Sequence, residues 1–327
     1  MAELSHLDRD GSALRTVICK DCGLVWSDPL PMDVAQYYEH DYRLDYKAAY
    51  TPKPKHIYRA GLVALERLKK INNAFKPGGS LLDVGSGGGE FLYLMNQLGY
   101  QTQGIEPNQG YARYSMEQYG LQVLRGFVQE ANFPPQHFDG ITIWHVLEHT
   151  ADPAATLTLL KNWLKPGGTL VVEVPNVEAV CQSPKGRFHR AHIFNFNQAT
   201  LETLGKKVGL VPLGTLHSAD GGNLTARFQL PAATGAAQSA AHYALPGNYS
   251  RIEKIVREHG NLSHYLSGHP YRRAWRKLLR ARDEARAVGG LSGGKEILNA
   301  CYRAQLASQN RARDASTATP IPQPEGV

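Results

Sequence analysis

Leu81-Leu82-Asp83-Val84-Gly85-Ser86-Gly87-Gly88-Gly89-Glu90-Phe91 is the stretch that decides the fold of this 327-residue chain. Residues 80–84 are a short, mostly apolar run, which is typical of a buried parallel strand. The glycines that follow predict a sharp turn, and residues 90–95 predict the start of a helix. Glycine suits a turn at which a ligand approaches the backbone closely and some φ angles are positive. The stretch therefore predicts a strand, a ligand-binding turn and a helix.

An acidic residue ends the next predicted strand. Residues 101–105 have a strand pattern, and Glu106 follows them. A carboxylate at this place can accept hydrogen bonds from both ribose hydroxyls of a nucleoside bound over the first turn. The glycines at 85, 87 and 89 do not meet the G-x-G-x-x-G pattern of dinucleotide-binding dehydrogenases, because position 90 is Glu. The pattern therefore favours a nucleoside cofactor of another kind.

Three pieces of the chain resemble the class I S-adenosylmethionine (SAM) methyltransferases. Residues 83–89, Asp-Val-Gly-Ser-Gly-Gly-Gly, closely resemble motif I of that family, and residues 104–107, Gly-Ile-Glu-Pro, resemble its acidic motif. Residues 164–170, Leu-Lys-Pro-Gly-Gly-Thr-Leu, are similar to a third recognisable piece. The resemblance covers roughly residues 57–230. It implies a Rossmann-like α/β fold with a mostly parallel seven-stranded sheet, helices on both faces, and SAM as the cofactor.

The resemblance also implies which residues bind SAM. Residues 127–129 stand where the family has its adenine-binding loop, and Trp144 ends the fourth predicted strand, residues 138–144. Ligands of open α/β sheets gather at such carboxyl ends. The expected cofactor-binding residues are Asp83, Gly85, Ser86, Gly87, Gly89, Glu106, Pro107, Phe127, Val128, Gln129, Trp144 and His145.

Composition and length limit the classes of protein to which this chain can belong. The chain is 42% hydrophobic, which is enough for a sizeable core, and its length suggests one main domain with appendages. It has no run of about 18 apolar residues, and its first residues lack the apolar region of a signal peptide. The four cysteines make no disulfide framework. A cytoplasmic protein without a membrane partner is expected.

The chain divides by composition into five parts, and its charge is uneven. From Tyr249 onward 14 Lys and Arg face 7 Asp and Glu, which accounts for the whole net charge of +7. Such a run usually forms a solvated face, and contact with phosphate or nucleic acid is the alternative. The predicted parts are an N-terminal knuckle and lid segment (1–56), a SAM-binding domain (57–230), a linker (231–248), a basic helical appendage (249–310) and a disordered tail (311–327).

The N-terminal part contains Cys19-Lys-Asp-Cys22-Gly, which is half of a zinc ribbon. A structural zinc ion needs four ligands, and no second cysteine pair follows, so no metal is expected. Zinc on Cys19 and Cys22 is the alternative. Bacterial small-molecule methyltransferases with a similar knuckle continue into a segment rich in proline and tyrosine, as this chain does. Its tyrosines are expected to pack, or one of Tyr37, Tyr38 and Tyr42 to act in a lid over SAM.

Two histidine clusters are candidates for catalysis. His145, Glu148 and His149 follow the fourth strand, and they are expected to hydrogen-bond the turn, to act on a hydroxyl, or to bind a divalent ion. His189 and His192 lie in a loop between the fifth strand and the next helix, where class I methyltransferases place substrate-binding residues. A histidine base must reach the acceptor hydroxyl. The expected order of candidates for the base is His192, His145, His189.

Together these patterns predict a SAM-dependent methyltransferase that acts on an oxygen or carbon of a small molecule, such as a sugar or secondary metabolite. Two alternatives stay open. The basic C-terminal region suits an RNA methyltransferase, although no RNA-binding module is recognisable and the rest of the chain has balanced charge. A non-catalytic SAM-binding protein is the other. The expected partner is a small-molecule acceptor and not nucleic acid, while the sequence leaves the acceptor and the oligomeric state open.

Overall fold

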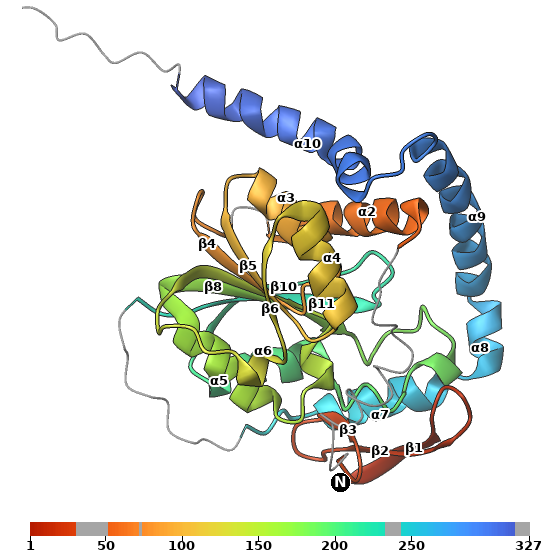
Figure 1. Ribbon diagram of the computed structural model, residues 1–327. Coiled ribbons are helices and arrows are strands. Elements are labelled where there is room, and N and C mark those ends of the chain that lie inside the picture. The colour runs from red at the N-terminus through yellow and green to blue at the C-terminus, as the bar shows by residue number, and fades with distance from the viewer. Residues whose placement is uncertain (31–51, 72–73, 233–242, 318–327) are drawn as a thin grey trace, which may run out of the picture.

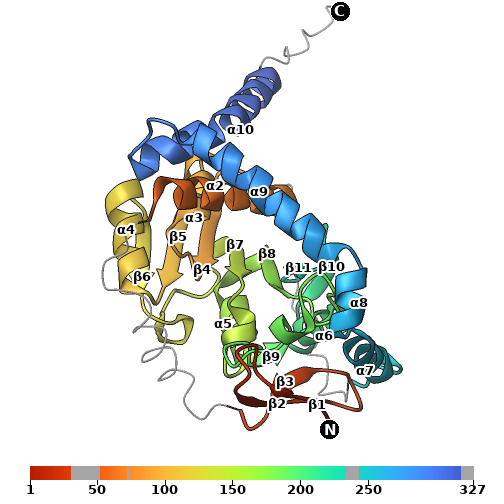
Figure 2. The same ribbon diagram turned by 90° about the vertical axis from the view of Figure 1, so that its right-hand side faces the viewer.

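A seven-stranded sheet forms the centre of the molecule in the computed structural model, which describes residues 1–30, 52–71, 74–232 and 243–317 (Figures 1 and 2). Its strands, from edge to edge, are β10 (Val211–His217), β11 (Asn223–Gln229), β8 (Leu164–Pro175), β7 (Phe138–Trp144), β4 (Ser80–Val84), β5 (Gln101–Glu106) and β6 (Gln122–Arg125). Neighbouring strands are parallel except for the two pairs that include β11. The predicted Rossmann-like fold is confirmed.

Helices cover both faces of this sheet, and each face has its own hydrophobic core. One core includes Leu157 and Leu160, and the other includes Phe91, Leu92 and Leu94. Local signals start the helices: Asp152, for example, caps its helix by accepting a hydrogen bond from the Ala155 amide. In chain order, the helices of this domain are α2 (Pro54–Ile71), α3 (Glu90–Gln97), α4 (Gln109–Tyr119), α5 (Pro153–Trp163) and α6 (Gln198–Lys207).

A second, four-stranded sheet holds the N-terminal segment against the loop that carries His189 and His192. Its strands, in order, are β1 (Ala2–Leu7), β2 (Ala13–Ile18), β3 (Val25–Ser27) and β9 (Phe194–Asn195). Asp8 strengthens this attachment because its carboxylate accepts a hydrogen bond from the Arg190 amide at 2.9 Å. The sequence did not predict β1. The N-terminal segment thus shapes the surroundings of the two histidines.

The cysteine knuckle lies between β2 and β3. Within the part of the chain that the structure describes, no group of three metal-ligating side chains includes Cys19 or Cys22. Cys181 is buried, and Cys301 lies beside Gly61 of α2. The predictions about zinc therefore rest on the sequence alone. The proposed lid tyrosines, Tyr37, Tyr38 and Tyr42, fall outside the described residues.

The C-terminal region differs from the sequence-based prediction in two respects. It forms α7 (Asn248–Glu258), α8 (Asn261–Leu266), α9 (His269–Ala287) and α10 (Gly294–Thr317). Ile297, Leu298 and Tyr302 of α10 are fully buried against α2 and α3, so this helix completes a core of the main domain and is no mere appendage. The disordered tail was predicted to begin at residue 311, but α10 continues to Thr317. Alanine and arginine there favour a helix, and the helix-breaking prolines begin only at residue 320.

None of the helices in the described residues has both the length and the apolar character needed to cross a membrane.

Candidate functional site

A cavity of about 440 Å³ lies where β4, β5 and β7 end. Parallel strands of an open sheet present their carboxyl ends on one edge, so the loops after these strands meet there. Nine of the residues that the family resemblance assigned to SAM line it: Gly85, Gly87, Glu106, Pro107, Phe127, Val128, Gln129, Trp144 and His145. The sequence therefore brings residues from four separate loops to one place, as expected.

Three residues of the expected cofactor set do not line the cavity. Asp83 is fully buried below the glycine turn, where its Oδ1 accepts a hydrogen bond from the Thr142 hydroxyl at 2.6 Å. Ser86 lies beneath the turn, close to Gly104 of β5. Gly89 adjoins the first turn of α3. These three residues support the turn from behind, and their expected part in SAM binding stays a prediction.

Two glycines of the turn cannot be replaced without disturbing it. Gly85 has a φ of 73°, and a Cβ atom there would lie 2.4 Å from Cγ2 of Val146. Gly89 has a φ of 86°, and a Cβ atom would lie 2.6 Å from Cβ of Ser115 in α4. Positive φ angles are costly for other residues, and both contacts are too short for packed carbon atoms. The absence of a side chain therefore lets the backbone approach Val146 of the cavity wall at Gly85 and α4 at Gly89.

Glu106 is the acidic residue of the cavity. Its Oε2 accepts a hydrogen bond from the Gly87 amide, and its Oε1 accepts one from the Asn108 amide, each at 2.8 Å. Burial raises the pKa of Glu106 to about 7, although these two amides act in the opposite direction. Each carboxylate oxygen can accept a further hydrogen bond from a ligand. A buried carboxylate beside a glycine turn and the apolar walls of Phe127 and Val128 fit the ribose and adenine of SAM.

The affinity for SAM should depend on pH through Glu106. Ribose hydroxyls donate hydrogen bonds to a carboxylate, so the ionised form binds better, and this form predominates only above a pKa of about 7. Binding should therefore weaken by roughly tenfold as the pH falls from about 8 to about 6. Calorimetric titration with SAM across this range measures the effect. Glu106→Gln is the control, because a pH dependence that survives in this variant cannot come from Glu106.

His145 is held between two carboxylates at the end of β7. Its Nδ1 lies 3.3 Å from Oε1 of Glu148, and its Nε2 lies 3.2 Å from Oε1 of Glu173. Burial alone would lower the pKa of His145, but the two carboxylates outweigh it and raise the pKa to about 9. Lys70 and Thr225 hydrogen-bond the other oxygen of Glu173. His145 is therefore an imidazolium at neutral pH, and it can stabilise negative charge but cannot accept a proton.

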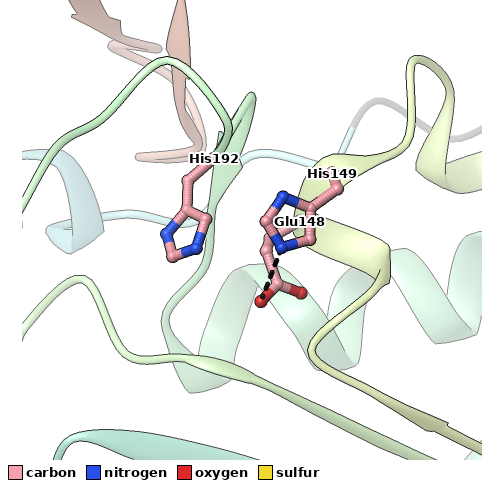
Figure 3. Close-up of side chains that lie close together, drawn as sticks. All are labelled: Glu148, His149 and His192. Atoms are coloured by element: carbon pink, nitrogen blue, oxygen red, sulfur yellow. Dashed lines mark ion pairs between the residues drawn. The ribbon is translucent and has the colours of Figure 1, made fainter. Parts of the chain in front are cut away.

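Glu148, His149 and His192 lie together beside the cavity (Figure 3). The Nδ1 of His149 is 2.5 Å from the carbonyl oxygen of Ala191, so this nitrogen must carry a hydrogen. Its Nε2 then faces Oε1 of Glu148 at 3.7 Å. The His192 ring lies beside that of His149, with the two ring centres 4.8 Å apart. Two chain segments far apart in the sequence thus meet at one buried acid.

This cluster has more hydrogen-bond acceptors than donors. Glu148 is only 1% exposed, and its Oε2 has no hydrogen-bond partner among the described residues. Ligand atoms of Glu148, His149 and His192 all lie within 4.8 Å of one another. A proton or a divalent cation would satisfy these acceptors, since two imidazoles and one carboxylate are a suitable ligand set for a transition-metal ion.

His192 and His189 form the outer part of the cluster, with ring centres 3.7 Å apart. Burial, together with the neighbouring His149, His189 and His145, lowers the pKa of His192 to about 2. Burial and Arg9 lower the pKa of His189 to about 4. Both rings are therefore neutral at physiological pH and have a lone pair for a proton or a metal ion. Neither ring lines the 440 Å³ cavity, which His145 and His149 separate from them.

Sequence reasoning missed several residues of the cavity wall. They are Val84, Ile105, Tyr111, Glu130, Val146, His149, Thr150 and Ala151. Tyr111 follows Asn108, which caps α4 by accepting a hydrogen bond from the Tyr111 amide. An N-cap just after the acidic residue was a usable signal, because it places the first turn of the next helix at the cavity.

Part of this chain is similar to known methyltransferases. Residues 56–213 match a family model described as a methyltransferase domain. The ubiquinone biosynthesis O-methyltransferase of Dinoroseobacter shibae is 33% identical over 156 residues, which cover 46% of this chain and 58% of that protein. The protein with the same name from Xanthomonas campestris pv. campestris is 34% identical over 109 residues, or 31% of this chain and 44% of that protein. The chain spans about half the length of the curated relatives it matches.

Among solved structures, a SAM-dependent methyltransferase from Archaeoglobus fulgidus is similar to 51% of this chain and 93% of that chain, with a TM-score of 0.44 and 20% sequence identity.

Proposed function

We propose that residues 56–213, which match a methyltransferase domain model, form a class I SAM-dependent methyltransferase domain, and that this chain transfers the methyl group of SAM to an oxygen atom of a small-molecule acceptor. The observation that carries the proposal is the His145 imidazolium in the wall of the SAM cavity, next to the cluster of Glu148, His149 and His192. The names of the similar proteins support oxygen over carbon. The acceptor class is a hydroxylated sugar or secondary metabolite.

The residues divide the chemical work between them. SAM, when bound, supplies a methyl group on a positively charged sulfur, which is already a good leaving group. The cavity positions this donor through Glu106 and the glycine turn, and alignment of two reactants accounts for much of such an acceleration. The His145 imidazolium stabilises the acceptor oxygen as it loses its proton. His192 accepts that proton as the general base, and the adjacent Glu148 carboxylate stabilises the imidazolium that forms, which offsets the burial that lowers the pKa of His192.

A second way to activate the acceptor follows from the unpartnered Oε2 of Glu148. A divalent cation held by Glu148, His149 and His192 would lower the pKa of a bound hydroxyl without a protein base. In that case His192 would be a metal ligand, and acceptors with two adjacent oxygens would be favoured because they can chelate the ion.

Chelation separates the two modes of activation. If His192 is the general base, removal of divalent ions with EDTA should leave the methylation rate within about twofold of its starting value, because no proton transfer depends on a metal. The rate is measured as the release of S-adenosylhomocysteine with a panel of hydroxylated sugars and phenols. A loss that Mn²⁺, Co²⁺ or Zn²⁺ restores, together with metal bound to the wild type but not to Glu148→Gln, would establish the metal-dependent mode instead.

A further inference from the structure

The outer surface of α8 and α9 exposes large apolar side chains. In α9, Tyr271, Trp275 and Leu279 recur every four residues and so share one face of the helix. The preceding helix α8 contributes Leu262, Tyr265 and Leu266. These six side chains, which we call the α8–α9 apolar face, are between 45% and 77% exposed. Soluble surfaces seldom expose so many large apolar residues together, and such patches mark interaction sites.

The same helix is strongly basic. Its 19 residues contain seven Lys and Arg against two acids, Asp283 and Glu284. Arg272, Arg280, Arg282 and Arg286 are exposed. One of the acids is already neutralised, because Glu284 is almost fully buried and accepts two hydrogen bonds of 2.7 Å from Arg59 of α2. The exposed part of α9 therefore combines an apolar stripe with a large positive charge.

The position of α9 makes its apolar stripe and its basic side chains accessible to a partner. The Arg59–Glu284 pair attaches the C-terminal half of α9 to α2, and the helix then runs along the outside of the molecule to α8 (Figure 2). On its inner side a groove of about 1230 Å³ separates it from the turn at Asp220 and the loop at Cys181. The helix is thus held at its end over a groove, and Glu284 alone is buried among the side chains of α9 that the structure describes.

We propose that the α8–α9 apolar face docks on the surface of a lipid bilayer that contains anionic phospholipid. Helices that lie in a membrane interface have low overall hydrophobicity, a basic polar face, and Trp and Leu on the other face, as α9 has. Trp and Tyr prefer the headgroup region because their rings are apolar with one polar group. The arginines are attracted to the negative surface of the bilayer. The sequence predicted a solvated basic face without a membrane partner, and the exposure of Tyr271, Trp275 and Leu279 changes that interpretation.

Two other occupants fit the surface less well. A second copy of the chain would bring two α9 helices, each with five more cations than acids, against each other, and like charges at an interface repel. A nucleic acid would use the cations and could stack on Tyr271 or Trp275, but Leu262, Leu266 and Leu279 offer no ring for stacking. A bilayer uses both the cations and the aliphatic side chains.

Vesicle binding by the full chain tests this proposal. Flotation should recover the wild type with vesicles of phosphatidylcholine and phosphatidylglycerol, and much less of it with pure phosphatidylcholine. Replacing three residues together, Tyr271→Ser, Trp275→Ser and Leu279→Ser, should reduce the partition coefficient by at least about tenfold. The matched control is Leu213→Ser with Leu216→Ser, since these residues are similarly exposed on the edge strand β10 and should leave binding within about twofold. Circular dichroism checks that both variants are folded.

Tryptophan fluorescence is a second readout of docking, and it works with a variant that still binds vesicles. The chain has four tryptophans, and Trp144 and Trp163 are buried while Trp275 is 62% exposed. Brominated lipids should therefore quench the emission of the wild type, and Trp275→Phe should remove most of that quenching while vesicle binding persists.

Three results would overturn the proposal. One is the absence of binding to anionic vesicles, or equal binding by the triple variant and the wild type. Another is a concentration-dependent dimer in light scattering that the triple variant abolishes, without vesicle binding. The third is a tight, salt-sensitive complex with single-stranded RNA that requires Trp275, while brominated lipids leave the emission unchanged.

Discussion

His192→Ala should lower the rate of methyl transfer by roughly 10²–10⁴-fold and leave the affinity for SAM nearly unchanged, because removal of a general base has an effect of this size. His192 does not line the SAM cavity, so the loss should appear in kcat and not in SAM binding. Its ring is neutral and lies next to that of His149, which lines the cavity. Single-turnover kinetics with saturating SAM measures the rate of the chemical step.

His217→Ala is the matched control for this variant. His217 is exposed on β10, where its Nε2 lies 3.0 Å from Oε1 of Gln198, so its loss should not change the rate. His145→Ala and His189→Ala complete the series. If a histidine acts as acid or base, at least one of the three alanine variants must lower the rate of methyl transfer. Near-wild-type rates in all three would rule out acid–base catalysis by histidine. The enzyme would then work by alignment alone or on an acceptor that is already ionised.

Glu106→Ala should weaken SAM binding by about 1–3 kcal/mol, which is the range for losing a charged hydrogen-bond acceptor. This corresponds to roughly a 5- to 150-fold increase in Kd. Isothermal titration calorimetry at pH 8 measures it, where the wild-type carboxylate is ionised. Glu117→Ala, an exposed acid on α4, is the control for a general change in charge.

The Glu106 variant also needs a check of folding, because Glu106 hydrogen-bonds the Gly87 and Asn108 amides that shape the cavity. A folded variant with wild-type affinity for SAM would contradict the assignment of this residue. Tighter binding of NADH than of SAM by the wild type would revive a dehydrogenase function.

The sequence predicts the SAM cavity well because its determinants are local. The turn at residues 85–89 and the acid at 106 each follow a strand whose pattern is readable, and parallel strands bring their ends together whatever the remaining chain does. Three residues of the expected cofactor set, Asp83, Ser86 and Gly89, belong to the same motif but do not line the cavity, because they lie behind the turn. A motif gives the position of a residue but not the direction in which it points.

The histidine cluster was only partly predictable because it depends on tertiary contacts. His149 and His192 meet because the loop that ends in β9 pairs with the N-terminal strand β3, and no local pattern indicates that pairing. The raised pKa of His145 depends on Glu173, which lies on a different strand. For the same reason the sequence missed that α10 completes a core: the contact of Tyr302 with Glu90 joins the two ends of the domain.

The most direct measurement is the fate of the methyl group of SAM. The wild type, incubated with carbon-13-methyl SAM and a pool of hydroxylated small molecules, should yield labelled product together with S-adenosylhomocysteine. The carbon-13 chemical shift of the transferred methyl group should be that of a methyl on oxygen, and the signal should be lost with His192→Ala but not with His217→Ala. A methyl signal typical of attachment to carbon, label found only on added RNA, or SAM that binds without ever being consumed would contradict the proposed function.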